Sequence, residues 1–298
     1  MKKVFLVSTL ALLLVNSAMA KSSIKAVFPE DGMTGVNTGV LEWSGQEGSR
    51  FDLYFGTDSD PKLYKSNLEK MKENPVIIEL NKKYFWKVVE KQKDTIIGTS
   101  KVFSFTTLPI QLNPNLKYKP FVDSRDGKVY WTIKIGRKEW MVQNLDYNLS
   151  GMSWYYGDSE KNKVYGRLYS GQAIGSSIDD ICPAGWHIPA ENEWRELLSE
   201  FGGEKTAGPS VKESSASFWS KSKNTRSNAS GMTVLPSGSR DRKPSYSNLG
   251  KYAFFWTSTS VPKKPDNFYK IDFGFMRDQA LINAGSPEWS YSIRCVKD

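Results

Sequence analysis

Residues 181–201 read ICPAGWHIPAENEWRELLSEF and contain the clearest helical pattern in the chain. Four apolar side chains recur at positions i, i+3, i+4 and i+7 of this stretch: Trp194, Leu197, Leu198 and Phe201. This spacing places them on one face of an amphipathic helix. Pro189 and Gly202 bound the helix near residues 190 and 201. Ala190 offers the first amides no side-chain acceptor, at a cost of about 1 kcal/mol relative to Ser or Thr. We expect this helix to pack on a core.

Six blocks in order along the chain resemble the Fibrobacter succinogenes major paralogous domain. They are VYWTIKIGRKEWMVQNLDY (129–147), YGRLY (165–169), CPAGWHIPAENEW (182–194), SGMTVLPSGSR (230–240), FFWTSTS (254–260) and SIRCVKD (292–298). The resemblance covers about residues 118–298. It implies a C-type-lectin-like fold, more distantly similar to formylglycine-generating enzyme: an α+β domain with long irregular loops. The resemblance implies an architecture and names no ligand.

Residues 1–20 have the pattern of a secretory signal peptide. Two lysines precede an apolar run over 4–15, and Ala-Met-Ala stands before Lys21. The run is too short to span a bilayer comfortably, and no second one follows, so we expect no membrane span. The pattern predicts export by a cleavable signal peptide, to the periplasm, the cell surface or the medium.

Residues 21–108 alternate short apolar runs with turn signals and show no long helical pattern. Strand candidates are 24–28, 40–43, 51–55, 76–80, 84–89 and 101–106. They predict an all-β sandwich. The blocks FPEDGMTGVNTGVLEWS, FDLYFGTDSDP, KKYFWKVVE and VFSFTT resemble a fibronectin-type-III-like module of bacterial surface proteins. The segment 109–120, with its prolines, is predicted to be a stiff linker to a second domain at 121–298.

The second domain has a hairpin pattern near its start. Strands are expected over 129–135 and 138–145, around a turn at Gly136 and Arg137. A short helix over 166–174 and strands over 254–258, 268–273 and 291–296 complete the expected elements. The polar tract 202–250 has no periodicity, so it is either a functional loop or irregular structure held by the core.

Cys182 and Cys295 are the only cysteines. An even pair in an exported chain predicts one disulfide. Such a bridge would close a loop for which chain-entropy estimates give about 4 to 5 kcal/mol. Lectin-like folds use a comparable long-range bridge. Two reactive or metal-binding thiols are the alternative.

Few residue patterns favour catalysis or a cofactor. His187 is the only histidine, and no G-x-S-x-G motif of serine hydrolases occurs. One His and two Cys far apart in the sequence do not supply a convincing set of zinc ligands. The acids of the 181–201 helix are interpreted as a solvated face rather than a glycosidase pair. We therefore expect a non-enzyme without cofactor, and leave calcium open on the aspartates of the loops. The net charge of +9 is diffuse, so nucleic acid is a poor candidate partner.

Loop aromatics are the candidate ligand-binding residues: Trp154, Tyr155, Tyr156 and Trp289. These residues do not belong to the periodic apolar pattern of a helix or strand. Exposed aromatic rings can stack on the apolar faces of sugars. The hypothesis is an exported binding or adhesion protein that recognises an extracellular ligand, plausibly polysaccharide, through the Trp154 loop and the 202–250 tract. One alternative is a structural or assembly protein of the cell surface that binds other proteins. A less favoured one is a formylglycine-generating-like enzyme, which would need reactive cysteines.

Overall fold

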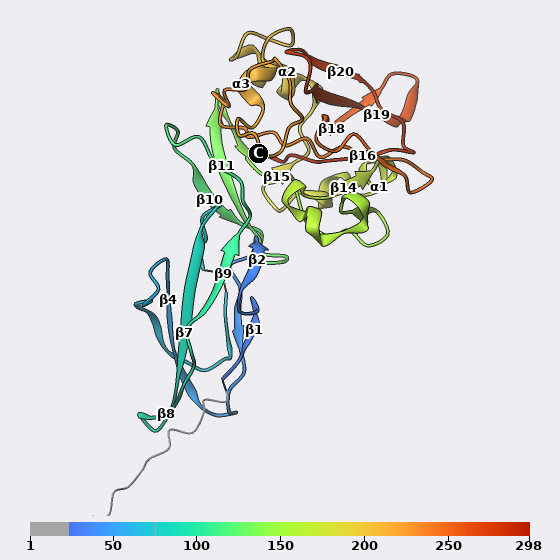
Figure 1. The fold of residues 1–298 in the computed structure, drawn as a ribbon. Coiled ribbons are helices and arrows are strands. Elements are labelled where there is room, and N and C mark those ends of the chain that lie inside the picture. The colour runs from blue at the N-terminus through green and yellow to red at the C-terminus, as the bar shows by residue number, and fades with distance from the viewer. Residues whose placement is uncertain (1–23, 75) are drawn as a thin grey trace, which may run out of the picture.

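The computed structural model describes residues 24–74 and 76–298, and is shown in Figure 1. The predicted signal peptide at 1–20 lies outside the described residues. None of the described helices is both long and apolar enough to cross a membrane.

The expected fold class is wrong. The chain is mostly β-structure, with 39% of residues in strands and 12% in helices, and no separate α+β lectin-like domain is distinguishable in the part described. The C-terminal region instead consists of three sheets with short helices between them. Many of its strands are two to four residues long. Such short strands contain too few residues to show a period of two, so the sequence pattern did not predict them.

Two sheets form the N-terminal part, which extends downward in Figure 1. Their strand orders are β1-β3-β6 and β2-β9-β7-β4-β5, with β8 paired to β7. The bounds are β1 (Ala26–Phe28), β2 (Met33–Val36), β3 (Leu41–Trp43), β4 (Arg50–Gly56), β5 (Leu63–Leu68), β6 (Lys72–Glu73), β7 (Lys83–Gln92), β8 (Thr95–Thr99) and β9 (Phe103–Thr107). A single core joins the two sheets, and includes Trp43, Phe51 and Trp86. The strand expected over 76–80 is absent, although Val76 and Ile78 are buried in this core.

The C-terminal part contains sheets of order β10-β11-β12-β22-β15, β13-β14-β21-β16-β17 and β18-β19-β20. The strand bounds are β10 (Lys119–Val122), β11 (Val129–Ile135), β12 (Lys138–Met141), β13 (Ser153–Trp154), β14 (Leu168–Ser170), β15 (Trp186–His187), β16 (Ser239–Arg240), β17 (Tyr246–Ser247), β18 (Tyr252–Val261), β19 (Lys264–Gly274), β20 (Ala280–Ala284), β21 (Ser290–Tyr291) and β22 (Val296–Lys297). The helices are η1 (Tyr156–Asp158), η2 (Glu160–Tyr165), α1 (Gly171–Ile181), α2 (Glu191–Ser199) and α3 (Gly208–Val211).

Helix α2 confirms the helix predicted from 181–201. Trp194 is fully buried, with its ring 4.9 Å from that of Trp140 and 5.4 Å from that of Phe255. The missing cap is partly replaced, because the Glu193 carboxylate accepts a hydrogen bond from the Ala190 N–H at 2.7 Å. This is the return half of a capping box. The apolar face of the helix therefore packs in the largest buried cluster of the C-terminal part.

The predicted disulfide is confirmed. Cys182 follows α1, Cys295 precedes β22, and their sulfur atoms are bonded across 113 residues of sequence. Both cysteines are buried. The bridge fastens the end of α1 to β22 and uses both cysteines of the chain.

The short helix expected over 166–174 is wrong. Gly166 has a positive φ of 69°, residues 168–170 form β14, and the helix begins only at Gly171. The Ser170 hydroxyl caps it by accepting a hydrogen bond from the Ala173 N–H at 3.1 Å. Serine is a common N-cap residue, and Ser170 here marks a helix start five residues later than expected.

Core contacts hold much of the 202–250 tract. Trp219 is buried, and its Nε1 donates to the Val234 carbonyl at 3.0 Å. Met232 is fully buried beside it in the same cluster. In this part of the tract the irregular backbone is structural, while residues 240–246 lie at the surface.

Candidate ligand-binding surface

The Trp154 loop and the 202–250 tract meet in one sheet, β13-β14-β21-β16-β17. Trp154 ends β13, and Arg240 ends β16. The guanidinium carbon of Arg240 lies 3.8 Å from the centre of the Trp154 ring and 5.8 Å from that of Tyr246. Both distances are within the range of cation–π attraction. Two segments distant in sequence thus build one surface.

Tyr156 and Asp158 complete this surface from the loop after β13. The Tyr156 ring lies 5.2 Å from that of Tyr246 at an angle of 57°. The Tyr246 hydroxyl donates to Asp158 Oδ1 at 2.6 Å. Burial of the phenol, and then this carboxylate, raise the pKa of Tyr246 to about 12. We call the five residues Trp154, Tyr156, Asp158, Arg240 and Tyr246 the Trp154 surface.

The loop that carries Tyr156 has an unusual backbone. Gly157 and Asp158 have positive φ values of 66° and 51°. Glycine adopts this region freely, and aspartate tolerates it better than most residues. The Asn162 side chain donates to the Tyr156 carbonyl at 2.8 Å and closes the turn. The backbone therefore directs the Asp158 carboxylate toward Tyr246.

Tyr155 does not join the Trp154 surface. Its ring lies 4.1 Å from the guanidinium carbon of Arg167. Burial, followed by the charge of Asp146, raises the pKa of Tyr155. Asp146 is itself buried, and accepts a hydrogen bond from the Asn37 amide of the N-terminal part at 2.6 Å. Burial raises the pKa of Asp146 even though Lys128 and Arg167 act to lower it. Tyr155 thus belongs to the junction between the two parts.

Trp289 lies in a different aromatic group from Trp154. Its ring stacks on Tyr291, with centres 6.2 Å apart and planes 8° from parallel. The centre of the Tyr291 ring lies 5.2 Å from that of Phe254. The Phe254 ring in turn lies 5.6 Å from the ring of Tyr252. Its neighbour Glu288 accepts a hydrogen bond from Arg242 of the 240–246 segment at 3.0 Å. Trp289 therefore lies beside the β16–β17 hairpin and does not stack on Trp154.

Sequence reasoning missed Arg240, Tyr246 and Asp158. Arg240 and Tyr246 lie on strands of two residues each, which pair with one another around the turn 241–245. Strands this short leave no periodic signal. The only available signal was the composition of the turn itself, DRKPS, because Asp and Pro favour turns.

The sole histidine lies in a charged cluster beneath α2. Its ring nitrogens lie 3.0 Å from Glu193 and 2.5 Å from Asp298. Glu193 also pairs with Lys138 at 2.6 Å. Burial favours the protonated acid, but Lys138, the Ala190 N–H and His187 outweigh it and lower the pKa of Glu193. This cluster joins α2, β12 and the last residue of the chain.

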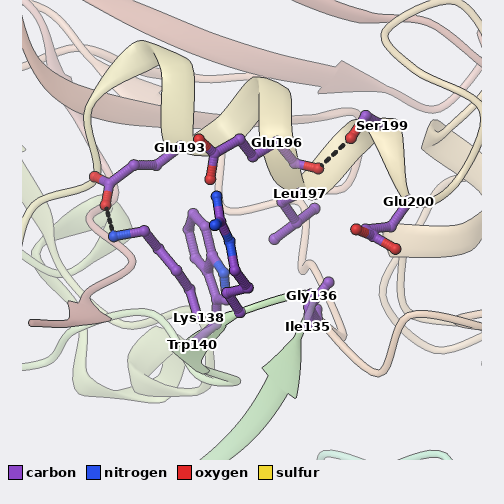
Figure 2. A pocket seen from close by; sticks show the side chains of 10 residues that line it. Ile135, Gly136, Lys138, Trp140, Glu193, Glu196, Leu197, Ser199 and Glu200 are labelled. Atoms are coloured by element: carbon purple, nitrogen blue, oxygen red, sulfur yellow. Dashed lines mark hydrogen bonds and ion pairs between the residues drawn. The ribbon is translucent and has the colours of Figure 1, made fainter.

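Figure 2 shows the cavity beside this cluster, between α2 and the turn at Gly136. Glu193 points to Lys138, and Glu196 and Glu200 follow along the helix. The cavity holds about 180 Å³. Ligand pockets usually hold about 300–1,000 Å³, so this one is small. In the stretches 24–74 and 76–298, no three His, Cys, Asp or Glu side chains are grouped so that they could hold a metal ion.

The model of the Fibrobacter succinogenes major domain matches residues 133–297, more than half of the chain. The chain belongs to the Fibrobacter succinogenes major domain family. The match includes β12 to β22, and so the whole Trp154 surface.

No curated protein matches the chain. Among solved structures, an α-L-rhamnosidase from Dictyoglumus thermophilum is similar over 37% of this chain, with 18% identity and a TM-score of 0.22. The match covers 16% of the rhamnosidase chain. A likeness this distant supports no conclusion about fold or function.

Proposed function

We propose that this is an exported binding protein that holds an extracellular polysaccharide at the Trp154 surface. The observation that carries the proposal is that the Arg240 guanidinium lies over the Trp154 ring, 3.8 Å from its centre, and within 5.8 Å of the centre of the Tyr246 ring. It brings two aromatic rings, a guanidinium and, through Tyr246, the Asp158 carboxylate to one place. Export rests on the sequence pattern of residues 1–20.

These side chains suit a sugar for chemical reasons. Aromatic rings exclude water from the apolar face of a pyranose, and a carboxylate or guanidinium orients its hydroxyls. Trp154, Tyr156 and Tyr246 are half-buried, so each ring is held by neighbours and still reaches solvent. The cation–π contacts of Arg240 and the hydrogen bond from Tyr246 to Asp158 fix the rings before a ligand arrives, which reduces the entropy lost on binding.

Co-sedimentation of the full mature chain with insoluble polysaccharides tests the proposal. Cellulose, insoluble xylan and insoluble mannan are suitable because each is a repeating pyranose chain with apolar ring faces on which aromatic side chains stack. We expect the wild type to sediment with at least one of them, and Trp154→Ala to remain in solution. Tyr64→Ala is the matched control, because Tyr64 is an exposed aromatic residue of the N-terminal part. Wild-type protein that binds none of these polymers, or Trp154→Ala that binds equally well, would contradict the proposal.

A second candidate function is cell-surface assembly through protein partners. Strand β5 is the edge of its sheet, and Leu63 and Tyr64 on it are 53% and 46% exposed. An uncovered edge offers unpaired backbone groups to another strand. Under this alternative, Tyr64→Ala and Leu63→Lys reduce cross-linking to surface proteins in the native cell, whereas Trp154→Ala leaves it unchanged. The opposite pattern would favour the Trp154 surface.

A further inference from the structure

A cavity of about 480 Å³ lies at the junction of the N-terminal and C-terminal parts. In Figure 1 this junction is where the upper ends of β7 and β9 approach β10 and β11. The turn before β7, the segment 110–114 and the side chains of Tyr118 and Trp131 line the cavity. Its size is typical of small-ligand pockets, which hold about 300–1,000 Å³ and often lie between domains.

The walls of this junction cavity are held in place from both parts. Trp131 Nε1 donates to the Ile78 carbonyl at 3.2 Å, so its indole is fixed across the junction. The Asn81 N–H donates to the Leu108 carbonyl at 2.8 Å. Ile110, at 2% exposure, anchors the segment between the two parts. The cavity is therefore formed before any ligand enters, which favours binding.

The lining of the cavity combines aromatic rings with uncharged amide side chains and one pair of opposite charges. Trp131 and Tyr118 are half-buried and supply the apolar surface. Asn81 and Gln111 are exposed at the rim and carry amides that can both donate and accept. This mixture of ring faces and two-way hydrogen-bonding groups matches the alternating C–H and O–H surfaces of a sugar.

The charges at the rim indicate a neutral ligand. Glu79 and Lys82 are the charged side chains among the lining residues, and they form an ion pair at 3.9 Å. They therefore leave no net charge to attract an ion. From these observations we infer that the junction cavity binds a neutral saccharide of one or two rings. This site is distinct from the Trp154 surface and does not depend on it.

Calorimetric titration of the full mature chain tests this inference. The probes are cellobiose, xylobiose and maltose, with digalacturonic acid as a charged counterpart. We expect saturable binding of at least one neutral disaccharide, accompanied by a change in tryptophan fluorescence that Trp131→Phe reduces. Asn81→Gly keeps the positive φ of 54° and removes the amide, and Gln111→Ala alters only an exposed side chain. Each should weaken binding about 2- to 10-fold, the value of one hydrogen bond.

Tyr64→Ala is the control, because Tyr64 is an exposed aromatic residue outside both sites, and it should leave disaccharide binding at the junction unchanged. Failure of all three neutral disaccharides to bind up to their solubility limits would overturn the inference. Equal binding by the wild type, Asn81→Gly and Gln111→Ala would also overturn it. Digalacturonic acid that binds as tightly as the neutral sugars would refute the neutral assignment. Loss of binding in Trp154→Ala with the junction variants unaffected would place the sugar at the Trp154 surface instead.

Discussion

The guanidinium of Arg240 lies over the indole of Trp154, with 3.8 Å from its central carbon to the ring centre. The two residues are on strands β13 and β16, separated in the sheet by β14 and β21. The pair fixes one face of the indole and places donors beside it. We regard it as the centre of the proposed binding surface.

Arg240→Ala should weaken polysaccharide binding by about tenfold, because the ring loses its cation–π partner and the ligand loses a donor. Arg240→Lys should restore only part of the affinity, since an ammonium cannot stack as a flat guanidinium does. Affinity electrophoresis in gels containing soluble polysaccharide measures both variants. Arg242→Ala is the control, because Arg242 is exposed and pairs with Glu288. Equal retardation of the Arg240 and Arg242 variants would show that stacking has no role.

Removing the disulfide should destabilise the chain. Cys182→Ala with Cys295→Ala frees a loop of 113 residues in the unfolded state. We expect the free energy of unfolding to fall by about 2–5 kcal/mol, measured by urea unfolding. A reducing agent should lower the stability of the wild type to the same level and leave the variant unchanged. An unchanged urea midpoint in the variant would contradict this account.

Lys212 should make stability depend on pH. It is fully buried, and its ammonium donates to the carbonyls of Gly274 and Arg277 at 2.6 Å each. Burial lowers the pKa of Lys212 to about 8. The folded chain therefore releases this proton at a lower pH than the unfolded chain does. Because the unfolded state then binds more protons, stability should rise with pH above about 8, by up to about 3 kcal/mol.

Urea unfolding between about pH 7 and pH 9 measures this dependence. Lys212→Met should flatten the rise, and should cost about 1–3 kcal/mol at neutral pH because two buried carbonyls lose their donor. Burial also lowers the pKa of Lys270 to about 8, so part of the rise should remain in the variant. A slope identical to that of the wild type would show that Lys212 keeps its proton throughout.

Asn37 should hold the two parts of the chain together. Its amide donates to the buried Asp146 carboxylate at 2.6 Å, across 109 residues. Asn37→Ala leaves that carboxylate with fewer donors, and we expect a loss of about 1–3 kcal/mol. Limited proteolysis should also cut the 109–120 segment faster. Asn192→Ala, at an exposed position of α2, is the control. The same cleavage rate in both variants would count against a role for Asn37 at the junction.

Sequence alone predicted the features that depend on periodicity or on cysteine pairing. The helix α2, the hairpin of β11 and β12 around Gly136, and the Cys182–Cys295 bridge were all found. Each is either long enough to show a period or covalent. The fold class was wrong, because the C-terminal sheets contain many strands of two residues, whose pairing depends on distant segments.

The candidate site was only partly predictable for the same reason. Trp154 and Tyr156 were recognised as loop aromatics, but their partners Arg240 and Tyr246 come from a tract without periodicity. Trp131 falls within the strand predicted over 129–135. Its position at the junction cavity depends on how the N-terminal part packs against β11, which no local pattern encodes.

The central claim is that the Trp154 surface binds polysaccharide. Calorimetric titration of the full mature chain with soluble xylan, pectin and mixed-linkage glucan tests it most directly, using wild type, Trp154→Ala with Tyr246→Ala, and Tyr64→Ala. We predict saturable binding of at least one polymer by the wild type and by Tyr64→Ala, and none by the folded double variant. Binding by the double variant equal to that of the wild type, or no binding by the wild type, would contradict the claim.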